Sequence, residues 1–495
     1  MKRYKHNLSH FRNSSTNMGS LTPIGAVEVN RGDTFKHNTN MFMRLSPLVN
    51  PIMHPVHAHI HHIFVPLRLI WDKWEDFITG GEDFDDASVV PTIDTTGSPV
   101  AAGDLLNHLG VPVGFEGKVN AFTARAYAFI YNEIYRDDQL QDKVGLATDS
   151  GDDTTTNTDL LNCNWAKDPF VSARPDEQLG AEVNLPLGGE APVTGIGVAN
   201  QTPAGPLSPI YEADSTSSTT YAEGWSAHGT NQVLIEADGD DNPNIYADLS
   251  KATASTINEL RLAIATQQWQ EKINTSGNKY QDYLKRYGIK YSDARIDRPE
   301  WLAGGKQTVQ FSEIIQTAEG TDPVGTLKGH GIAALRSNNY MKFFEEDGIV
   351  ISLLNVKPIS MYMQSLPRMY SRRAKEDFYQ KEYEILGMQE VPNKEVKHDH
   401  SSPDGTFGYQ PRFDDYRRVP NTVHGEFATV LKDWHMAREF AGDIALNDSF
   451  VTCTPTKRIF ADQTSDHLYL TVQHKLAARR LIRTKHQPSG LSLKI

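Results

Sequence analysis

The segment Met53–Gly81 (MHPVHAHIHHIFVPLRLIWDKWEDFITGG) constrains the fold most, because a strand pattern runs directly into a helix pattern. Its first half places His57, His59 and His61 two residues apart. Side chains with this spacing lie on one side of a β-strand. The pattern therefore predicts a strand over 57–65 with the three imidazoles on one face.

The second half of the segment has the spacing of an amphipathic helix. Pro66 is favoured in a first helical turn because its missing N–H costs nothing there, and Gly80 is a common helix stop. The sequence thus predicts a helix over 66–80. Its apolar face consists of Leu67, Ile70, Trp71, Trp74, Phe77 and Ile78.

The histidine row first suggests a metal site. Metal ligands normally converge from more than one element, whereas a row on one strand face does not converge by itself. We therefore favour imidazoles that stack and hydrogen-bond in a packed layer or a subunit contact, with metal binding as the alternative. Protonation near pH 6 would then modulate this contact. We predict no metal and no cofactor.

Alternating apolar residues elsewhere indicate further strands, and helical spacing indicates further helices. Gly, Ser, Thr, Asp and Asn dominate 195–253, which predicts a surface insertion rather than a domain with its own core. The whole pattern favours a mainly β chain, an antiparallel sandwich with long inserted loops and several helices. The predicted strands cover 33–45, 349–356, 425–431 and 467–475, and the predicted helices cover 122–135, 279–287 and a segment that opens at Thr256.

Composition and motifs narrow the function. The chain is 39% hydrophobic, which allows a sizeable core, and no apolar run reaches membrane-spanning length. No signal-peptide pattern opens it, and two cysteines suit a reducing compartment. The sequence has no phosphate loop and no GxGxxG, HExxH, CxxC or GxSxG motif. We expect a soluble protein that is not an enzyme, with a β-sandwich carbohydrate-active enzyme as the alternative.

Charge is unevenly placed along the chain. The net charge is −13, yet no acidic residue precedes Glu28 and none follows Asp466. An acidic body with two basic ends suggests that the ends meet a polyanion. Ordinary solvated termini are the alternative. The candidate DNA-binding residues are Lys2, Arg3, Lys5, Arg12, Arg479, Arg480 and Arg483.

Arginine and aromatic residues interleave over 368–373 and 409–418. Such mixtures suit protein–protein hot spots and single-stranded nucleic acid alike, and we favour an interface between subunits. With the histidine row and the two tryptophans of the predicted helix, they complete one set. The candidate subunit-interface residues are His57, His59, His61, Trp71, Trp74, Arg372, Arg373, Arg417 and Arg418.

Six further segments join Met53–Gly81 in one consistent order. They are GDTFKHNTNMFMRLSPL (Gly32–Leu48), NWAKDPFVSARPDEQLGAEVNLPLGG (Asn164–Gly189), TINELRLAIATQQWQEKI (Thr256–Ile273), DARIDRPEWLAGG (Asp293–Gly305), MYMQSLPRMYSRR (Met361–Arg373) and FGYQPRFDDYRRVPNTVHGEF (Phe407–Phe427). Together these segments resemble the major capsid protein of small single-stranded DNA phages, the microviruses, and most closely the gokushovirus-like branch. The resemblance covers most of the chain, with a break at Gly195–Thr253.

The resemblance implies an eight-stranded antiparallel jelly roll that self-assembles into a T=1 icosahedral shell around circular single-stranded DNA. It implies an exposed protrusion near the threefold axes at 195–253, a candidate contact for a host surface receptor. It also implies a place in the virion, after folding and assembly in the cytoplasm of a bacterial host and without a membrane. A minor virion or pilot protein is an expected partner.

We expect one jelly-roll domain over 1–495, with a basic N-terminal arm over 1–27 and a last strand with a basic C-terminal tail over 467–495. The basic ends carry too few charges to neutralise a packed genome. Additional cations or a small basic DNA-binding protein are therefore expected. A carbohydrate-binding spike module that forms no shell is the remaining alternative.

Overall fold

The computed structural model describes residues 2–83, 85–181, 183, 193–194, 246–247, 257–276, 280–288, 297–315, 317 and 325–483. The chain divides into two compact units. One unit combines Met1–Glu177 with Asn274–Ile495, and the other is Gln178–Ile273. The single domain predicted from the sequence is thus a large unit interrupted by a second one. The predicted insertion 195–253 falls in the second unit and, apart from Tyr246–Ala247, lies outside the described residues.

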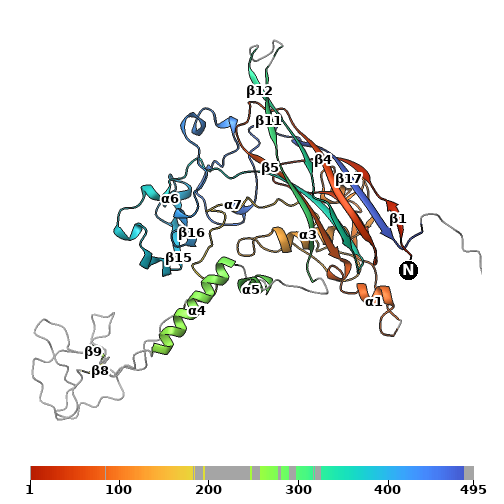
Figure 1. Cartoon of the computed structure of the whole chain (residues 1–495), viewed down its shortest axis with the longest axis horizontal. Coiled ribbons are helices and arrows are strands. Elements are labelled where there is room, and N and C mark those ends of the chain that lie inside the picture. The colour runs from red at the N-terminus through yellow and green to blue at the C-terminus, as the bar shows by residue number, and fades with distance from the viewer. Residues whose placement is uncertain are drawn as a thin grey trace, which may run out of the picture. The chain divides into compact units, whose positions relative to one another are not determined.

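Two antiparallel sheets build the large unit (Figure 1). The seven-stranded sheet has the order β1 (Tyr4–Asn7), β17 (Leu468–Arg480), β4 (Thr34–Leu45), β12 (Leu327–Arg336) and β11 (Gln310–Ile315), with β2 (His10–Thr16) beside β17 and β13 (Tyr340–Phe343) beside β4. The four-stranded sheet has the order β10 (Glu300–Thr308), β5 (Val56–Pro66), β14 (Gly348–Pro358) and β3 (Leu21–Val29). The predicted mainly β antiparallel sandwich is confirmed, whereas the eight-stranded jelly-roll connectivity stays a prediction.

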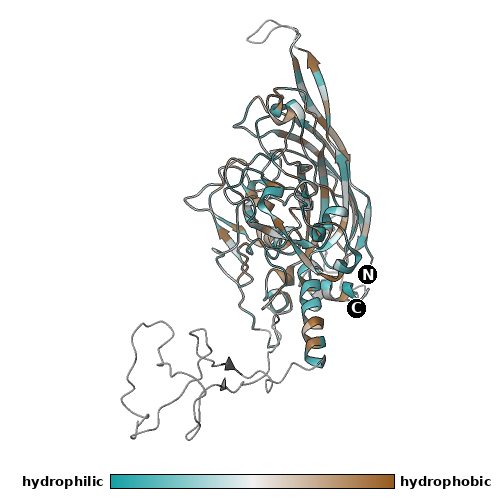
Figure 2. Cartoon of the chain, turned by 90° about the vertical axis from the view of Figure 1, so that its left-hand side faces the viewer, coloured by the Kyte–Doolittle hydropathy of each residue, from teal (hydrophilic) through white to brown (hydrophobic). Residues whose placement is uncertain are grey.

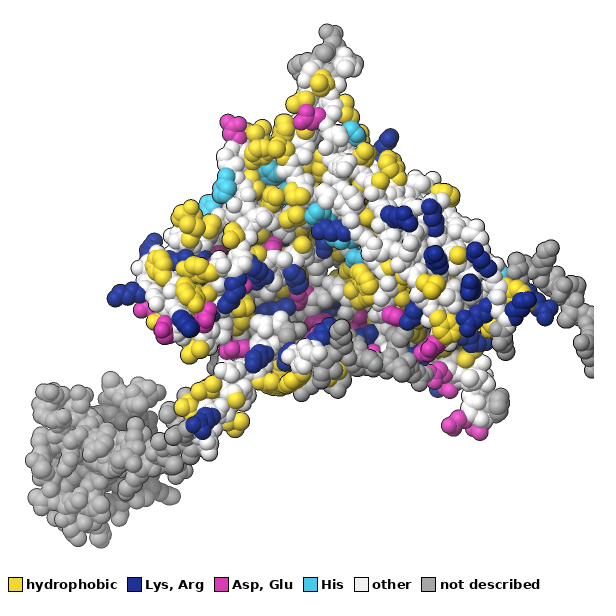
Figure 3. Space-filling view, in the orientation of Figure 1, with side chains coloured by type: hydrophobic (Ala, Val, Ile, Leu, Met, Phe, Trp, Pro, Cys, Tyr) yellow, Lys and Arg dark blue, Asp and Glu magenta, His cyan; other side chains and the backbone are white. Residues whose placement is uncertain are grey.

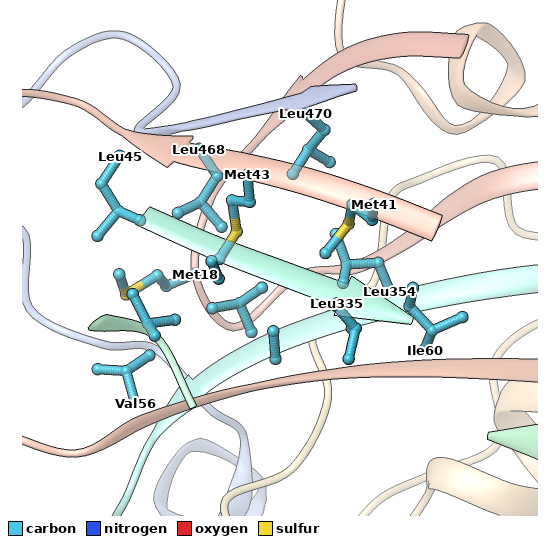
Figure 4. Close-up of a cluster of buried hydrophobic side chains, with 14 of the residues drawn as sticks. Met18, Met41, Met43, Leu45, Val56, Ile60, Leu335, Leu354, Leu468 and Leu470 are labelled. Carbon is cyan, nitrogen blue, oxygen red and sulfur yellow. The ribbon is translucent and has the colours of Figure 1, made fainter. Parts of the chain in front are cut away.

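Alternation along the strands explains the core. In β17, buried Leu468, Leu470 and Val472 alternate with outward-facing residues, because successive side chains of a strand point to opposite faces. Figure 2 shows hydrophobic and hydrophilic residues interleaved along the long strands. Figure 4 shows side chains of both sheets meeting in one cluster, which includes Met43 and Leu335 from one sheet and Ile60 and Leu354 from the other. This burial of apolar area is the main force that holds the two sheets together.

A buried polar network also lies between the sheets. His62 is bonded through Nδ1 to Ser352 Oγ at 2.8 Å and through Nε2 to Ser337 Oγ at 3.0 Å. His37 Nε2 lies 3.2 Å from His474 Nδ1, and all three histidines are almost completely buried. Burial lowers the pKa of His37 to about 3 and that of His474 to about 4. The folded sandwich therefore holds these histidines neutral.

The predicted helix over 66–80 is wrong as a continuous element. Pro66 is the last residue of β5, Leu67–Leu69 form one 3-10 turn (η1), and the helix α1 is only Trp74–Thr79. The chain leaves the helical path between these two pieces because Ile70 and Trp71 turn into the core, where both are fully buried. Gly80 does end α1, with a φ of 91° that suits glycine.

The remaining predictions divide in the same way. The strands over 33–45, 349–356 and 467–475 are confirmed as β4, β14 and β17, and the helix over 122–135 as α3 (Phe122–Ile130) followed by a π-helical turn, Tyr131–Tyr135. The helices predicted at Thr256 and over 279–287 are α4 (Ile257–Ser276) and α5 (Tyr280–Arg286). The strand over 425–431 is wrong: Gly425–Ala428 form a 3-10 turn, and Gly425 has a φ of 67° that breaks an extended chain.

Shorter elements complete the description. They are α2 (Leu105–Leu109), α6 (Asn393–Val396) and α7 (Asp448–Val451), with the paired strands β6 (Thr92–Asp94) and β7 (Lys118–Asn120), β15 (Met388–Pro392) and β16 (Thr406–Pro411), and β8 (Val193–Thr194) and β9 (Tyr246–Ala247). Side chains of α2 and α3, among them Leu105 and Tyr127, pack on residues of β5 and β14 such as Ile63 and Ile351. No helix in the described part of the chain is long and apolar enough to cross a membrane.

Candidate nucleic-acid and assembly surfaces

The two basic ends of the chain are neighbours in the seven-stranded sheet. Strand β1 pairs with the end of β17, which places Lys5 opposite Arg479 and Tyr4 opposite Arg480. Most of the expected N-terminal arm, 1–27, forms β1, β2 and the first part of β3, so it is part of the sandwich and not a free arm. The end of the predicted C-terminal tail, 484–495, lies outside the described residues.

The basic residues lie on both sides of the seven-stranded sheet, and only those on its outward side are available to a ligand. Lys5 and Arg479 point outward and are exposed. Arg12 and Arg480 point to the opposite side and bind their own chain. Arg12 donates to the carbonyl oxygen of His108, and burial lowers its pKa. Arg480 donates to the carbonyl oxygen of Glu28 at 2.6 Å and forms an ion pair with Asp33 at 3.0 Å, so both arginines have structural partners.

The other three candidates lie next to the paired ends of β1 and β17. Arg3 donates to Thr34 Oγ1 at 3.2 Å, and its guanidinium lies 4.6 Å from the centre of the Phe343 ring. Lys2 lies 5.6 Å from the centre of the Tyr4 ring. Arg483 is exposed just after β17. These residues remain available to a ligand at the edge of the sheet.

Four further cations lie on this face; Lys475 belongs to the predicted basic C-terminal end but was not selected as a DNA-binding candidate, and the other three were missed by the sequence reasoning. They lie within strands, at outward positions between buried residues, so only the alternation of each strand could have found them. With Lys5 and Arg479 they define the basic face. Its members are Lys5, Lys36, Arg44, Arg336, Lys475 and Arg479, all exposed and none in an ion pair within the described part of the chain.

The basic face has no acidic counterpart among the described strands. The seven strands of this sheet contain a single carboxylate, Glu313, and it lies opposite the buried Gly329, on the side that faces the core. Figure 3 shows lysine and arginine side chains gathered over the β1 and β17 side of the molecule. Since the whole chain carries a net charge of −13, this face is a local exception that would attract a polyanion.

The histidine row lies on the outer side of the four-stranded sheet and is only partly accessible. His61 Nδ1 lies 2.6 Å from the Tyr135 hydroxyl, and its ring centre lies 4.3 Å from that of Trp301. His57, near the end of the row, is bonded to Thr308 at 3.1 Å. The three ring centres are spaced by 6.3 and 6.0 Å, which agrees with the predicted row on one strand face.

Burial determines the charge of this row. It lowers the pKa of His59 to about 4 and that of His61 to about 3, with neighbouring cations adding to the effect at His59. These two imidazoles therefore stay neutral at pH 6 in the folded chain, contrary to the expectation from the sequence. Across the described residues, no group of three or more His, Cys, Asp or Glu side chains is placed to hold a metal ion.

The two candidate interface tryptophans have different surroundings. Trp71 is fully buried, and its Nε1 donates to Ser150 Oγ at 2.9 Å, so it offers no surface to a neighbouring subunit. Trp74 is partly buried and packs on the same core, with its ring centre 6.1 Å from that of Trp71. The sequence could not separate these roles, because helical spacing marks an apolar face but not what covers it.

The four candidate arginines between positions 372 and 418 differ in their contacts. Arg372 pairs with Asp415 and lies 4.2 Å from the centre of the Tyr416 ring, while Arg418 forms an ion pair with Asp414 at 2.5 Å. Both are tied to their own chain. By contrast, Arg373 and Arg417 are exposed. They lie in a segment with many exposed large apolar side chains, namely Met369, Tyr370, Phe378, Tyr379, Ile385, Leu386, Tyr416 and Val419, which we call the loop patch.

Comparison with known proteins gives a consistent result. The family model described as "Capsid protein (F protein)" matches residues 1–489. A relative named "Capsid protein VP1" from Bdellovibrio phage phiMH2K is 32% identical, over 92% of this chain and 89% of its own length. Proteins of the same name from Chlamydia phage 1 and Spiroplasma virus 4 are 28% and 29% identical, over 93% and 89% of this chain.

These relatives match almost the whole chain and most of their own length. The resemblance to microvirus capsid proteins is thereby confirmed, and with it a structural role in the virion. The chain belongs to the capsid protein (F protein) family.

Proposed function

We propose that this chain is a major capsid protein that self-assembles into a T=1 icosahedral shell around circular single-stranded DNA, with the basic face turned toward the DNA. The observation that carries the proposal is the basic face itself: six exposed, unpaired cations on a sheet without an outward-facing acid among its described strands. Lysine and arginine that neutralise phosphates release condensed counterions, which favours contact with nucleic acid.

The loop patch supports the self-assembly part of the proposal. The patch has eight large apolar side chains exposed within one segment, and Tyr, Phe, Met and Arg are enriched at protein interfaces. Ile385 is 85% exposed and Val419 is 81% exposed, so contact with a second copy would remove both from water. The exposed Arg373 and Arg417 add positive charge to the same segment.

The proposal also includes further partners. Six cations per copy are few against a packed genome, so we expect bound cations or a small basic protein inside the shell. A minor virion or pilot protein, a receptor contact through 195–253, and folding and assembly in the bacterial host cytoplasm complete the proposal.

The orientation of the basic face is tested by cysteine labelling of assembled particles. Lys475→Cys places a thiol on the basic face, and the native Cys163 and Cys453 are 1% and 0% exposed, so the background is low. A maleimide attached to a large polyethylene glycol should label the variant fully when unassembled and hardly at all in closed, DNA-filled particles. Equal labelling in both states would show that the face is external and would overturn the proposed orientation.

A further inference from the structure

Four aromatic residues of this sheet are exposed at outward positions: Phe11 in β2, Phe343 in β13, Phe42 in β4 and Tyr469 in β17. The last two lie on the adjacent central strands, in the middle of the basic face. Phe42 in β4 and Tyr469 in β17 are each 45% exposed, and neither ring belongs to a ring–ring pair within the described residues. They lie on central strands of the sheet, at outward positions flanked by the small residues Thr471, Ala334 and Ser15. Nearly half of each side chain is therefore open to a ligand.

The register of the strands fixes how the two rings are related. Tyr469 lies opposite Arg44, and Phe42 lies opposite Thr471, so the aromatic residues are diagonal neighbours on the same face. Diagonal neighbours are about 7–8 Å apart, and long side chains stand roughly perpendicular to a sheet. This spacing is about twice the contact distance of 3.5–4.0 Å between carbon atoms. Two rings that stand parallel at this spacing would leave room for one planar group between them.

Cations surround this position on the same face. Arg44 is directly opposite Tyr469, and Arg336 lies opposite Asn40, two residues along β4 from Phe42. Lys475 and Lys36 continue the positive surface along β17 and β4. A planar base between two rings, with its phosphates within reach of arginine, is the arrangement by which proteins bind single strands without reading their sequence.

We infer that Phe42 and Tyr469 form a base-stacking site that makes the basic face bind single-stranded DNA in preference to duplex DNA. The inference rests on the proposed contact between this face and DNA. Duplex bases are already stacked on each other and present only their edges in the grooves, so the rings would gain nothing from a duplex. The cations, by contrast, would bind the phosphates of either form.

An acidic protein partner is the competing occupant. It would use the same cations, and the aromatic residues could contact apolar side chains of such a partner. The described strands of this sheet carry no outward acid, and the carboxylate nearest the site in the chain, Asp466 just before β17, already accepts hydrogen bonds from Ser15 at 2.6 Å and Asn17 at 2.8 Å. A strand surface with cations and no acid favours a ligand with a continuous row of negative charges over one with mixed charges. We therefore assign the site to nucleic acid and make the acidic protein an outcome of the test.

The test measures binding of the full-length, unassembled chain to three fluorescent probes: short oligodeoxythymidylate, a duplex of equal length, and polyglutamate. We expect Phe42→Ala/Tyr469→Ala to weaken oligodeoxythymidylate binding by about ten-fold or more, since a base stacked on an aromatic ring contributes this order of affinity. Duplex binding should change by less than about two-fold. Met341→Ala, another exposed apolar residue of this face at 77%, is the matched control and should leave all three affinities unchanged.

The outcomes separate the two levels of the proposal. Equal weakening for single strand and duplex, or no weakening, overturns the stacking site but leaves the DNA-facing role of the cations intact. Wild-type chain that binds no DNA overturns both, and selective loss of polyglutamate binding assigns the rings to a protein partner. Phe42→Leu/Tyr469→Leu keeps apolar area without aromatic faces. It should reproduce the loss with an unchanged thermal midpoint, which excludes misfolding as the cause.

Discussion

At the residue scale, the sandwich depends on histidines that stay uncharged because they are buried between the two sheets. His37, His62 and His474 are buried and neutral, each bonded to a neighbour within the core. The sequence pattern singled out His57, His59 and His61 of β5. His62, one position further on, points to the other side of the strand and into the core. A one-residue step along a strand reverses the environment of a side chain, and no composition argument can detect this.

These histidines predict a loss of stability in acid. The folded-state pKa of His37 is about 3 and that of His474 about 4, while an unfolded chain has a histidine pKa of about 6.5. Folding therefore favours the neutral form, so stability is complete above pH 6.5 and falls as pH drops toward the folded values. The free energy of unfolding of the unassembled chain, measured with denaturant, should fall between pH 7 and pH 5 by about 2 kcal/mol per buried histidine.

The variant His62→Gln tests the assignment, because glutamine keeps hydrogen-bonding groups but does not titrate. It should be less stable than wild type at pH 7, yet lose less stability between pH 7 and pH 5. An unfolding free energy that stays constant over this range in the wild type would contradict the account.

A second residue-scale prediction concerns the buried ion pair between Arg125 and Asp153. Their side chains are 1% and 0% exposed, and Arg125 Nε donates to Asp153 Oδ2 at 2.7 Å. Burial alone would raise the pKa of Asp153, but hydrogen bonds from Thr156 and the guanidinium of Arg125 outweigh it and lower the pKa. Removing the guanidinium leaves a buried carboxylate without its partner. Arg125→Met should cost about 3–5 kcal/mol of unfolding free energy.

The matched control is Lys118→Met, which removes an ion pair with Asp152 whose side chains are 52% and 56% exposed. Solvent screens this pair, so we expect no measurable change in the denaturation midpoint. If both substitutions had the same effect on stability, burial would not be the factor that decides the strength of these pairs.

At the element scale, clean alternation made some strands predictable and others not. β4, β14 and β17 follow from the sequence because their apolar residues alternate or run continuously against one core. The helix over 66–80 failed because its apolar residues reach the core in two separate pieces, and the strand over 425–431 failed because Gly425 adopts a positive φ. Periodicity shows which residues of a segment share an apolar face, but it does not show whether the segment forms one continuous helix or strand.

The candidate DNA-binding residues, too, could be predicted from the sequence only in part. Lys5 and Arg479 were identified from the charge of the chain ends, and the structure places them opposite each other. Arg12 and Arg480 were selected on the same grounds, yet they lie on the other side of the sheet and have partners there. The alternation of each strand could have placed Lys36 and Arg44 at outward positions, but only the register, which joins residues more than four hundred positions apart, brings them beside Lys475 and Arg479.

Because the two sides of β17 differ in this way, cations on the outward side should affect DNA binding, whereas Arg480 on the other side should affect stability. Lys36→Gln/Lys475→Gln removes two cations of the basic face, so the slope of log K against log[salt] for single-stranded DNA should become shallower by about 1.4. Arg480→Gln is the control from the opposite side of β17. It should lower the stability of the chain, because Asp33 loses its ion pair, and leave the slope unchanged. A slope that responds to Arg480 and not to the lysine pair would contradict the placement of the basic face.

At the scale of the whole molecule, the chain combines an acidic body, one basic sheet face and an exposed apolar loop patch. Cations on one face and apolar surface elsewhere suit a subunit that meets other copies at its sides and a polyanion on one side. Family membership is consistent with this arrangement, since this chain matches proteins named as capsid proteins over most of their length.

The central claim, that this chain closes into an icosahedral shell, is tested most directly by the mass of the purified particle in sedimentation or native mass measurement. Sixty copies of a 55.3 kDa chain give a protein mass of about 3.3 MDa, to which any packaged DNA adds. A single species of at least this mass, closed and uniform in size, is the predicted result. A chain that stays monomeric, or forms only small oligomers in the presence of single-stranded DNA, would contradict the account.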